Sequence, residues 1–515
     1  MRRLSVPLLA FAALACTLLG PTADAGAFSA ERPNQSQAAA NRLDRHDQRA
    51  LDRATVALGD GTVAGTDRRI DATLALRDLF LARPSLGAQD DRAAGHLLAR
   101  PTDGAQDPYG DGYATSSTKK CGPDICVHWV RSGADAPPDD AWARKTLDVM
   151  QQVWRHHVDV FGYRPPAKDG GRGGNGRFDV YLEELGNQGL YGYCAPENRV
   201  SGKPLQASGF CVLDDDFARS QFGRAPIDTL RVTAAHEFFH AIQFAYDFRE
   251  DPWLLESTAT WMEERFADDV NDNRSYLRYG QVAKPAQSLD LFEPGGFAHY
   301  GNWPFWEFLS QRYGNGIVRQ VIQRAGTGGG LPNDYSTEAV RHVLADKGGL
   351  AKVFAAYAAA NTDPASTYHE GRAFPTAVPA DTARLRTGDD RTAYETRIDH
   401  LASSSLRLRP DETLAGKRWR LRVKINAPDA TTSPAAYLIA TRTDGTSYAR
   451  SIDLNSTGYG MTEVAFSHRS IATVTVTMAN VSTRFRCGRK TSYSCAGVPR
   501  DQGLKFAVGA QAYRN

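Results

Sequence analysis

The sequence carries almost no net charge and no long run of one sign of charge. Its 515 residues include 61 lysine and arginine residues and 59 aspartate and glutamate residues, which gives a formal net charge of +2. A chain balanced in this way has no overall preference for nucleic acid, so we expect no nucleic-acid partner. Internal repeats are also lacking. With 42% hydrophobic residues, the chain is long enough for two or three globular domains with sizeable cores.

Long apolar runs are scarce as well, because no segment beyond the first 25 residues approaches the length of a membrane-spanning helix. The start of the chain differs: two arginines precede an apolar run, and small residues follow at the two positions that signal peptidase reads, in MRRLSVPLLAFAALACTLLGPTADAGA. This order predicts a signal peptide over residues 1–25 and a soluble, secreted, extracellular mature protein. Lipid attachment at Cys16 is an alternative, although Ala13 stands where a lipoprotein signal usually has leucine.

Cysteine is sparse, and one of the seven lies in the predicted signal peptide. The other six fall into three local pairs: Cys121 with Cys126, Cys194 with Cys211, and Cys487 with Cys495. No CxxC motif occurs and the histidines do not cluster near these pairs, which argues against a cysteine metal site. An even number of paired cysteines outside the cytoplasm predicts three disulfides.

Residues 26–118 differ in pattern from the rest of the chain. They contain helical patches and then a stretch rich in glycine, aspartate, serine and threonine, TDGAQDPYGDGYATSSTKK, which indicates an exposed linker. Secreted hydrolases often carry such a region as a propeptide, so we expect a zymogen. An ordinary N-terminal helical domain is the alternative.

Residues 119–385 begin with strand-like sequence and continue with helix-like sequence. The strand-like segments are rich in β-branched and aromatic residues, and they are ICVHWVRS, GRFDVYLEEL and ASGFCVLDDDF. A helix with an apolar stripe lies between the first two, DDAWARKTLDVMQQVWRHHVDVFG. This order favours an α+β catalytic domain with an N-terminal sheet part and a C-terminal helical part.

Residues 395–515 show the two-residue period of half-buried strands. KRWRLRVKINA alternates basic with apolar residues, and Asp444-Gly445 lies between two strand-like runs as a hairpin signal. We expect a small β-sandwich. From residue 401 onward, 17 lysine and arginine residues stand against 7 aspartate and glutamate residues, a net charge of +10. This is either a solvated basic face or a contact for an anionic cell surface.

The segment VTAAHEFFHAIQFAYD carries the strongest chemical signal. His236 and His240 are four residues apart, so a helix places both imidazoles on one face, with Glu237 beside them. This spacing suits a zinc ion with a nearby general base. The alternative is a purely structural role, with a pair of core histidines beside a surface glutamate.

A catalytic zinc needs a third protein ligand, and the next segment offers one in DPWLLESTATWMEE. Asp251 and Pro252 predict the start of a second helix, with Glu256 one turn inside it. The short loop between the helices would reverse the chain and set Glu256 opposite His240. The rival ligands are Glu263, Glu264, Asp247 and His299. We expect the first two of these to be solvated or packed against arginines.

His236-Glu237-x-x-His240 followed by WLLESTATWMEE resembles the gluzincin metallopeptidases, whose second motif has the form W-x-x-E-x-x-A-x-x-x-E. The whole chain also resembles a bacterial group of secreted metalloproteases, and the strong match covers roughly residues 120–370. The resemblance implies a zincin-like α+β fold. It also implies zinc on His236, His240 and Glu256, with Glu237 as the catalytic acid and base. A metzincin is excluded, because no G-x-x-H follows at the right distance.

Two features depart from the gluzincin pattern. Only 15 residues separate His240 from Glu256, fewer than is usual in that family. Thr260 stands where thermolysin-like members have an aspartate that orients the first histidine. The groups that hold the ring nitrogens facing away from the metal are therefore not assigned by the sequence.

Peptide hydrolysis also needs a donor for the oxyanion, and FAHYGNWPFWEFLSQRYG offers candidates. The setting of Tyr300 is similar to that of the stabilising tyrosine in aminopeptidase-like gluzincins, and His299 is next to it. Aromatic packing is the alternative role for Tyr300. The strand ASGFCVLDDDF is a candidate for pairing with an extended peptide substrate.

Glycine-rich sequence collects oxygen ligands in PPAKDGGRGGNGRFDVYLEELG. Asp169, Asn175 and Asp179 on a tight loop would suit calcium, which secreted proteases often use for stability. The spacing does not match an EF-hand, and a solvent-exposed turn before a strand is the simpler alternative.

Together these features predict a secreted zinc-dependent endopeptidase that acts on protein or peptide substrates, with exopeptidase action left open. Glu237 would be the general base for a metal-activated water. Two other classes stay open: a surface-binding protein that keeps a metal site without turnover, and a zinc hydrolase of non-peptide amides.

Overall fold

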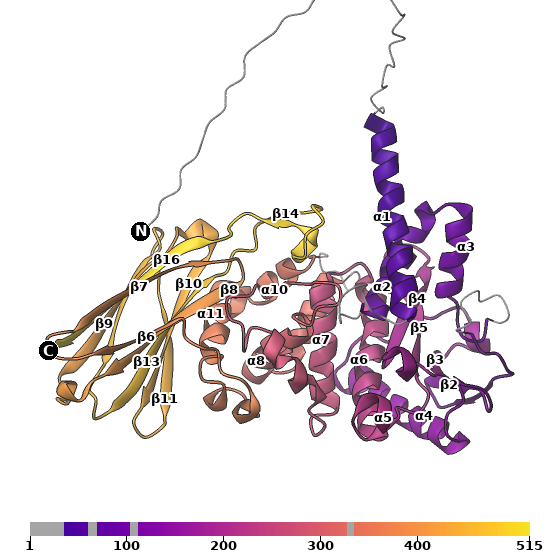
Figure 1. Ribbon diagram of the computed structural model, residues 1–515, viewed down its shortest axis with the longest axis horizontal. Coiled ribbons are helices and arrows are strands. Elements are labelled where there is room, and N and C mark those ends of the chain that lie inside the picture. The colour runs from indigo at the N-terminus through magenta and orange to yellow at the C-terminus, as the bar shows by residue number, and fades with distance from the viewer. Residues whose placement is uncertain (1–34, 60–69, 104–111, 327–333) are drawn as a thin grey trace, which may run out of the picture.

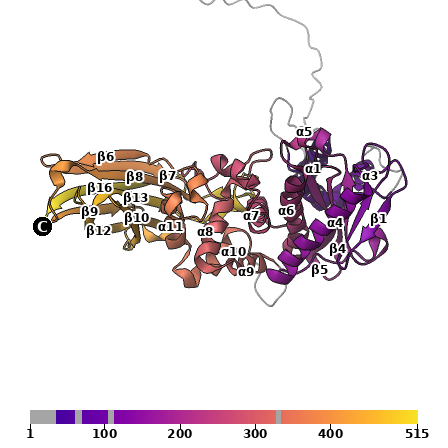
Figure 2. The ribbon, with the colours of Figure 1, turned by 90° about the horizontal axis from the view of Figure 1, so that it is seen from below.

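The computed structural model describes residues 35–59, 70–103, 112–326 and 334–515 of the chain (Figure 1). The predicted signal peptide and residues 104–111 of the predicted linker lie outside these ranges. The described chain is a mixed α/β structure with several sheets and a β-rich C-terminal region. Its three parts are arranged in succession along the longest axis, with the N-terminal sheet at one end, helices in the middle and a β-sandwich at the other end (Figures 1 and 2).

Helices open the described chain: α1 Gln35–Leu58, α2 Ala72–Ala82 and α3 Ala88–Leu97. Asp71 caps α2, because its carboxylate accepts a hydrogen bond of 2.6 Å from the Leu74 N–H. The predicted apolar face of α2, with Leu76 and Leu79 fully buried, packs into the same core as the neighbouring sheet. The N-terminal helices are therefore docked on the next part of the molecule.

A single sheet with strand order β1-β2-β3-β5-β4 forms the next part. Its strands are β1 Thr118–Cys121, β2 Ile125–Trp129, β3 Phe178–Glu183, β4 Gly192–Val200 and β5 Lys203–Asp214. Strands β2, β3 and β5 run parallel, and β4 pairs antiparallel with β5. Within the described chain β4 is therefore an edge strand, whereas β5 lies inside the sheet. The predicted pairing of β5 with a substrate finds no open edge over residues 211–213, because β3 and β4 already pair with the two sides of this stretch.

Helix α4, Asp140–Trp154, packs on this sheet through its apolar stripe. Asp139 caps it, since its carboxylate accepts from the Trp142 N–H at 2.8 Å. The long helices of the middle part come after a short helix, α5 Arg219–Phe222. They are α6 Pro226–Asp247, α7 Pro252–Phe266, α8 Trp303–Tyr313, α9 Gly316–Ala325, α10 Thr337–Val343 and α11 Leu350–Ala360.

The 22-residue helix α6 lies under the sheet, against β4 and β5, and α7 packs antiparallel to it after a short loop. Pro252 occupies the first turn of α7 as predicted. Asp251 stands at the cap position, but its carboxylate makes no capping bond and accepts instead from the Cys495 N–H at 2.8 Å. A loop of the C-terminal part thus contacts the beginning of α7.

The C-terminal part is a sandwich of two antiparallel-rich sheets with strand orders β11-β10-β13-β8-β6 and β12-β9-β16-β7. Its own apolar core lies between them. The first sheet contains β6 Asp381–Leu385, β8 Ala402–Pro410, β10 Pro434–Arg442, β11 Ser447–Ile452 and β13 Ile471–Asn480. The second contains β7 Arg391–Ile398, β9 Trp419–Asn426, β12 Tyr459–Ala465 and β16 Leu504–Arg514. A short pair, β14 Phe485–Arg486 with β15 Val498–Pro499, lies outside them.

The sandwich begins earlier than the predicted boundary at residue 395, because β6 pairs in parallel with β8. The predicted hairpin at Asp444-Gly445 joins β10 to β11. All three predicted disulfides are present, at Cys121–Cys126, Cys194–Cys211 and Cys487–Cys495. Among the described residues, no helix is both long enough and apolar enough to cross a membrane.

Candidate metal centre

Helices α6 and α7 bring three metal-ligating side chains to one place. His236 and His240 lie on one face of α6, and Glu256 faces them from α7. His236 Nε2 is 3.3 Å from Glu256 Oε2, and His240 Nε2 is 3.4 Å from Glu256 Oε1. One ligand atom from each residue lies within 4.8 Å of the others. The antiparallel arrangement of the two helices thus makes the cluster that their sequence predicted.

Hydrogen bonds on the other ring nitrogens fix both imidazoles. His236 Nδ1 lies 2.7 Å from Glu263 Oε1, and His240 Nδ1 lies 2.7 Å from Gln243 Oε1. Gln243 is anchored in turn by its Nε2, which donates to the Leu255 carbonyl at 2.9 Å. Since both acceptors are oxygens, each Nδ1 carries the proton and each Nε2 keeps its lone pair for a ligand.

The prediction that Glu263 would be solvated or packed against arginines is wrong. The Glu263 side chain is buried and is bonded to His236. Glu263 orients the His236 ring, the role that an aspartate has in thermolysin-like members at the position of Thr260. The Thr260 hydroxyl instead donates to the Glu256 carbonyl in its own helix. The sequence did contain the signal, since Glu263 lies two turns after Glu256 on the same face of α7.

Three of the converging atoms are buried and make no hydrogen bond, which is the arrangement expected of side chains that hold a cation. Among the described residues, His240 Nε2 and both Glu256 oxygens have no hydrogen-bond partner, and both side chains are fully buried. Buried polar atoms are nearly always satisfied in folded proteins. Two imidazole nitrogens that converge with a carboxylate whose oxygens have no hydrogen bond fit a divalent transition-metal ion.

Glu237 lies beside this cluster on the wall of a cavity of about 170 Å³. Burial raises the pKa of its carboxyl above the ordinary value, while the charges of His236 and His240 act to lower it. One carboxylate oxygen, Oε2, accepts a hydrogen bond of 3.1 Å from the Thr73 hydroxyl. A buried carboxyl with a raised pKa is suited to take up a proton and to return it.

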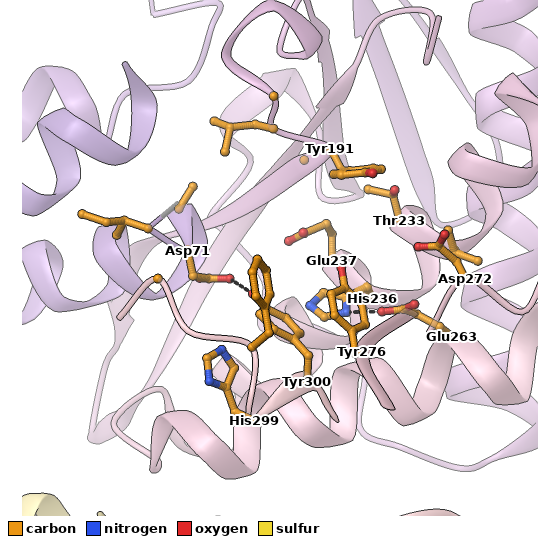
Figure 3. A pocket seen from close by; sticks show the side chains of 18 of the residues that line it. Asp71, Tyr191, Thr233, His236, Glu237, Glu263, Asp272, Tyr276, His299 and Tyr300 are labelled. Atoms are coloured by element: carbon orange, nitrogen blue, oxygen red, sulfur yellow. Dashed lines mark hydrogen bonds and ion pairs between the residues drawn. The ribbon is translucent and has the colours of Figure 1, made fainter. Parts of the chain in front are cut away.

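Tyr300 and His299 line the same cavity, on the side opposite Thr233 and Tyr191 (Figure 3). The Tyr300 ring lies 6.0 Å from that of His236, and its hydroxyl donates to Asp71 Oδ2 at 2.5 Å. His299 is buried, and burial lowers its pKa to about 4, so it is neutral at physiological pH. Its ring packs against Tyr300.

Asp71 is a residue of this site that the sequence did not reveal. It comes from the chain just before α2, 229 residues before Tyr300, and it lines the cavity together with Ile70 and Ala72. Burial raises its pKa to about 7, and the negative charge of Glu256 adds to this effect. Its only local signal was that of a helix cap, which says nothing about a distant metal centre.

The remaining rival ligands have other partners. Glu264 Oε2 accepts from the Asn273 side chain at 2.8 Å, and burial raises the pKa of Glu264 to about 8. Asp247 accepts from the Arg249 N–H at the end of α6. Neither belongs to the cluster of His236, His240 and Glu256.

The predicted calcium ligands surround an arginine instead of a cation. Arg100 is bonded to Asp169 at 2.8 Å and to Asp179 at 2.7 Å, with all three side chains buried. Asn175 is directed elsewhere, toward the Cys121–Cys126 disulfide. The guanidinium supplies the positive charge that these carboxylates need, so we do not carry the calcium interpretation further.

A second acidic group lies where β3 and β5 end, at Glu184, Asp214 and Asp215. Asp214 is engaged by the backbone, since it accepts from the N–H groups of Leu185, Gly186 and Phe217. It therefore ties the end of β5 to the loop after β3.

Comparison with known proteins does not assign the chain. No family model matches the sequence, and no curated protein matches it. Among solved structures, a similarity is found to CorA, described as a surface-associated copper-binding protein important in Methylomicrobium album BG8 copper acquisition. The two are 8% identical with a TM-score of 0.16, over 26% of this chain and 100% of that one. A likeness this weak carries no argument about fold or function.

Proposed function

We propose that the protein is a secreted zinc-dependent peptidase of the gluzincin type, with a zincin-like catalytic domain. One observation carries the proposal: two oriented imidazole nitrogens and an unpartnered carboxylate converge in a buried cluster, with a glutamate on the cavity wall beside them. Two nitrogens and one carboxylate form the ligand set of many catalytic zinc sites, which leave a position open for water. The disulfides are compatible with an extracellular location.

Each side chain has a defined task in peptide hydrolysis. His236, His240 and Glu256 would hold the zinc, which when bound lowers the pKa of water and polarises the scissile carbonyl. Glu237 would take a proton from the attacking water and return it to the leaving amine. Tyr300 is placed to donate its hydroxyl hydrogen to the oxyanion once that hydroxyl is free. His299, neutral and packed on Tyr300, would position that ring.

A peptide is favoured over another amide because an edge strand runs beside the cavity. Gly192 at the start of β4 lines the cavity, and β4 has one open edge among the described strands. An extended substrate can hydrogen-bond to such an edge. A binding protein without turnover is disfavoured, since Glu237 has no role in holding the metal but is kept beside it.

Metal content and turnover test this proposal separately. We expect purified protein to hold about one zinc per chain and Glu256→Ala to hold almost none, because a buried site with two imidazoles alone binds zinc weakly. Glu237→Gln should keep the zinc but lose about 10²–10⁴-fold in the rate of casein or peptide-library cleavage. Metal analysis after gel filtration and a peptide cleavage assay would measure these effects.

The proposal fails if Glu237→Gln cleaves peptides as fast as a matched protein with Glu237 that shows cleavage, or if Glu256→Ala keeps its full zinc content. As a matched control, Glu338→Ala changes an exposed glutamate on α10 that pairs with Arg341, and it should retain both zinc and activity.

A further inference from the structure

The start of α2 enters the cavity of the candidate metal centre. Ile70, Asp71 and Ala72 line this cavity together with Glu237 and Tyr300, and Figure 3 shows Asp71 directed at the Tyr300 side chain. They belong to residues 26–118, the region whose sequence predicted a propeptide. A segment of this region therefore occupies space next to the proposed catalytic groups.

Two hydrogen bonds engage the polar groups that the proposed reaction needs. The Tyr300 hydroxyl donates to Asp71 at 2.5 Å, and the Thr73 hydroxyl donates to Glu237 at 3.1 Å. A hydroxyl that already donates to a carboxylate is not available to a substrate oxyanion. A Glu237 oxygen that accepts from Thr73 has less capacity to accept a proton from water.

The same segment covers the open edge of β4. The Cys194 N–H donates to Thr73 Oγ1 at 3.0 Å, although Cys194 is aligned with Cys211 on the other side of the strand. This N–H points away from β5, so an extended peptide lying along β4 would need it. Thr73 therefore engages both the proposed general base and the edge of the substrate site.

Buried contacts hold the segment in place. Farther along α2, the Arg77 guanidinium donates to the Glu250 carbonyl at 2.9 Å, and its side chain is almost fully buried. The rings of Phe80 and Phe248 meet edge to face with centroids 5.5 Å apart. These contacts lie one to two turns from the cavity, so they can anchor α2 independently of Asp71 and Thr73.

We propose that Ile70–Thr73 is a self-inhibitory plug, which keeps the full-length chain latent until this segment leaves the cavity. The proposal rests on the proposed peptidase function, and it makes the plug and an extended peptide competitors for the same site. The Asp71 carboxylate engages the Tyr300 hydroxyl, and the Thr73 hydroxyl engages Glu237 and the Cys194 N–H, so none of these three groups is available to a substrate.

The test compares ligand access in zinc-loaded full-length proteins. In Asp71→Ser/Thr73→Val, serine keeps an oxygen that can cap α2 but is too short for Tyr300, and valine has the shape of threonine without its hydrogen bonds. The probe is a fluorescent leucine hydroxamate, which chelates zinc and places an apolar side chain in a cavity lined by Val232 and Phe297. Fluorescence anisotropy should show at least about tenfold tighter binding to the double variant than to the parent.

Asp91→Ser is the matched control, because Asp91 lies on the neighbouring helix α3 and pairs with Arg83 outside the cavity. It should bind the probe as weakly as the parent. Equal binding by the parent and the double variant, with zinc retained in both, overturns the plug and leaves the peptidase proposal intact. Protein that holds no zinc and binds no probe overturns the peptidase proposal, and the plug with it.

A second measurement uses the parent alone, in case the double variant folds poorly. Saturating hydroxamate should displace the plug, so amide hydrogen exchange of residues 70–76 should rise on addition of the probe. Exchange that stays unchanged while the probe is bound would overturn the proposal. Because the parent is expected to be latent, the Glu237→Gln cleavage comparison is made in the Asp71→Ser/Thr73→Val background.

Discussion

At the scale of single residues, the metal centre depends on acceptors that lie behind the two histidines. Glu263 and Gln243 each place an oxygen 2.7 Å from an imidazole Nδ1, on α7 and α6 respectively. Without them, each ring could rotate or carry its proton on the nitrogen that must face the metal. These are positioning residues, since they act on the metal through the histidines.

We expect Glu263→Ala to weaken zinc binding by about 10–100-fold, because His236 loses the acceptor that orients it. Glu263→Gln should lose less, since an amide oxygen can still accept from the ring. Competition with a chromophoric chelator would measure the affinity of each variant, and circular dichroism would show whether the helices are retained. Zinc affinity equal to that of the parent in Glu263→Ala would refute the positioning role.

The three metal ligands could be predicted from the sequence, whereas Asp71 and Arg100 could not. His236, His240 and Glu256 were predicted together, because helical periodicity and a short loop leave little freedom in how α6 and α7 can meet. Asp71 was missed, because nothing local connects a helix cap to a metal centre far along the chain. Arg100 was missed for the same reason, and without it the acidic loop looked like a calcium site.

At the scale of elements, the junction of β3 and β5 concentrates negative charge. Asp215 is 3% exposed, and its Oδ1 has no hydrogen-bond partner among the described residues. Burial, with the charges of Asp214 and Asp216 next in size, raises its pKa from an ordinary 3.8 to about 8. Between these values the folded chain keeps a proton that the unfolded chain releases, so stability falls as pH rises from about 4 to 8.

Asp215→Asn should remove this loss, because an amide does not ionise. We expect its melting temperature to match that of the parent near pH 4 and to exceed it by a margin that grows up to about pH 8. Thermal unfolding followed by circular dichroism across this range would measure the difference. Asp148→Asn, a change at an exposed position on α4, should behave like the parent throughout. A constant difference between Asp215→Asn and the parent at every pH would count against the raised pKa.

The elements themselves were largely predictable. Helix α4 carries an apolar stripe, strands β9 and β13 alternate with a 2-residue period, and strands β2 and β3 are rich in β-branched and aromatic residues. The two helices of the metal centre were indicated instead by the histidine spacing and by the Asp251-Pro252 start signal. Strand β4 was not recognised, and β5 was given the edge position that belongs to β4. Strand order is decided by pairing between distant segments, which a local pattern does not contain.

At the scale of the whole molecule, the sandwich is tied to the helical part by buried polar contacts. His400, in the turn between β7 and β8 of the sandwich, lies 2.9 Å from Asp290, and both side chains are almost fully buried. The other Asp290 oxygen accepts from the Ser494 N–H at 2.9 Å. Burial acts to lower the pKa of His400, but the charge of Asp290 and the hydrogen bonds to Asp290 and Gln502 together raise that pKa above its ordinary value. The pair therefore acts as a link between two separate apolar cores.

Asp290→Ala should destabilise the protein by about 3–5 kcal/mol, because it leaves His400 buried without its charged partner. Since each part has its own core, we also expect calorimetry to resolve two unfolding transitions in the variant where the parent shows greater overlap. Asp389→Ala removes an exposed partner of Arg386 and should change stability by no more than about 0.5 kcal/mol. Similar calorimetric traces for Asp290→Ala and the parent would contradict the proposed link.

Contact of the basic sandwich with an anionic cell surface stays a prediction. Lys424 on β9 is exposed, whereas Arg422 is paired with Glu463 on the neighbouring strand. This arrangement is compatible with a solvated basic face and also with contact to an anionic cell surface.

The sequence by itself determined the candidate metal ligands, the helices that carry them, the disulfide pairs and the β-rich C-terminal region. Each of these depends on residues that are close in the chain or on a regular period. The tertiary structure decided which groups orient the histidines, that Arg100 neutralises the acidic loop, and that Ile70–Thr73 lies in the cavity beside Glu237. Those relations join segments that are far apart in the chain, and they exist only because burial brings the segments together and leaves each polar group in need of a partner.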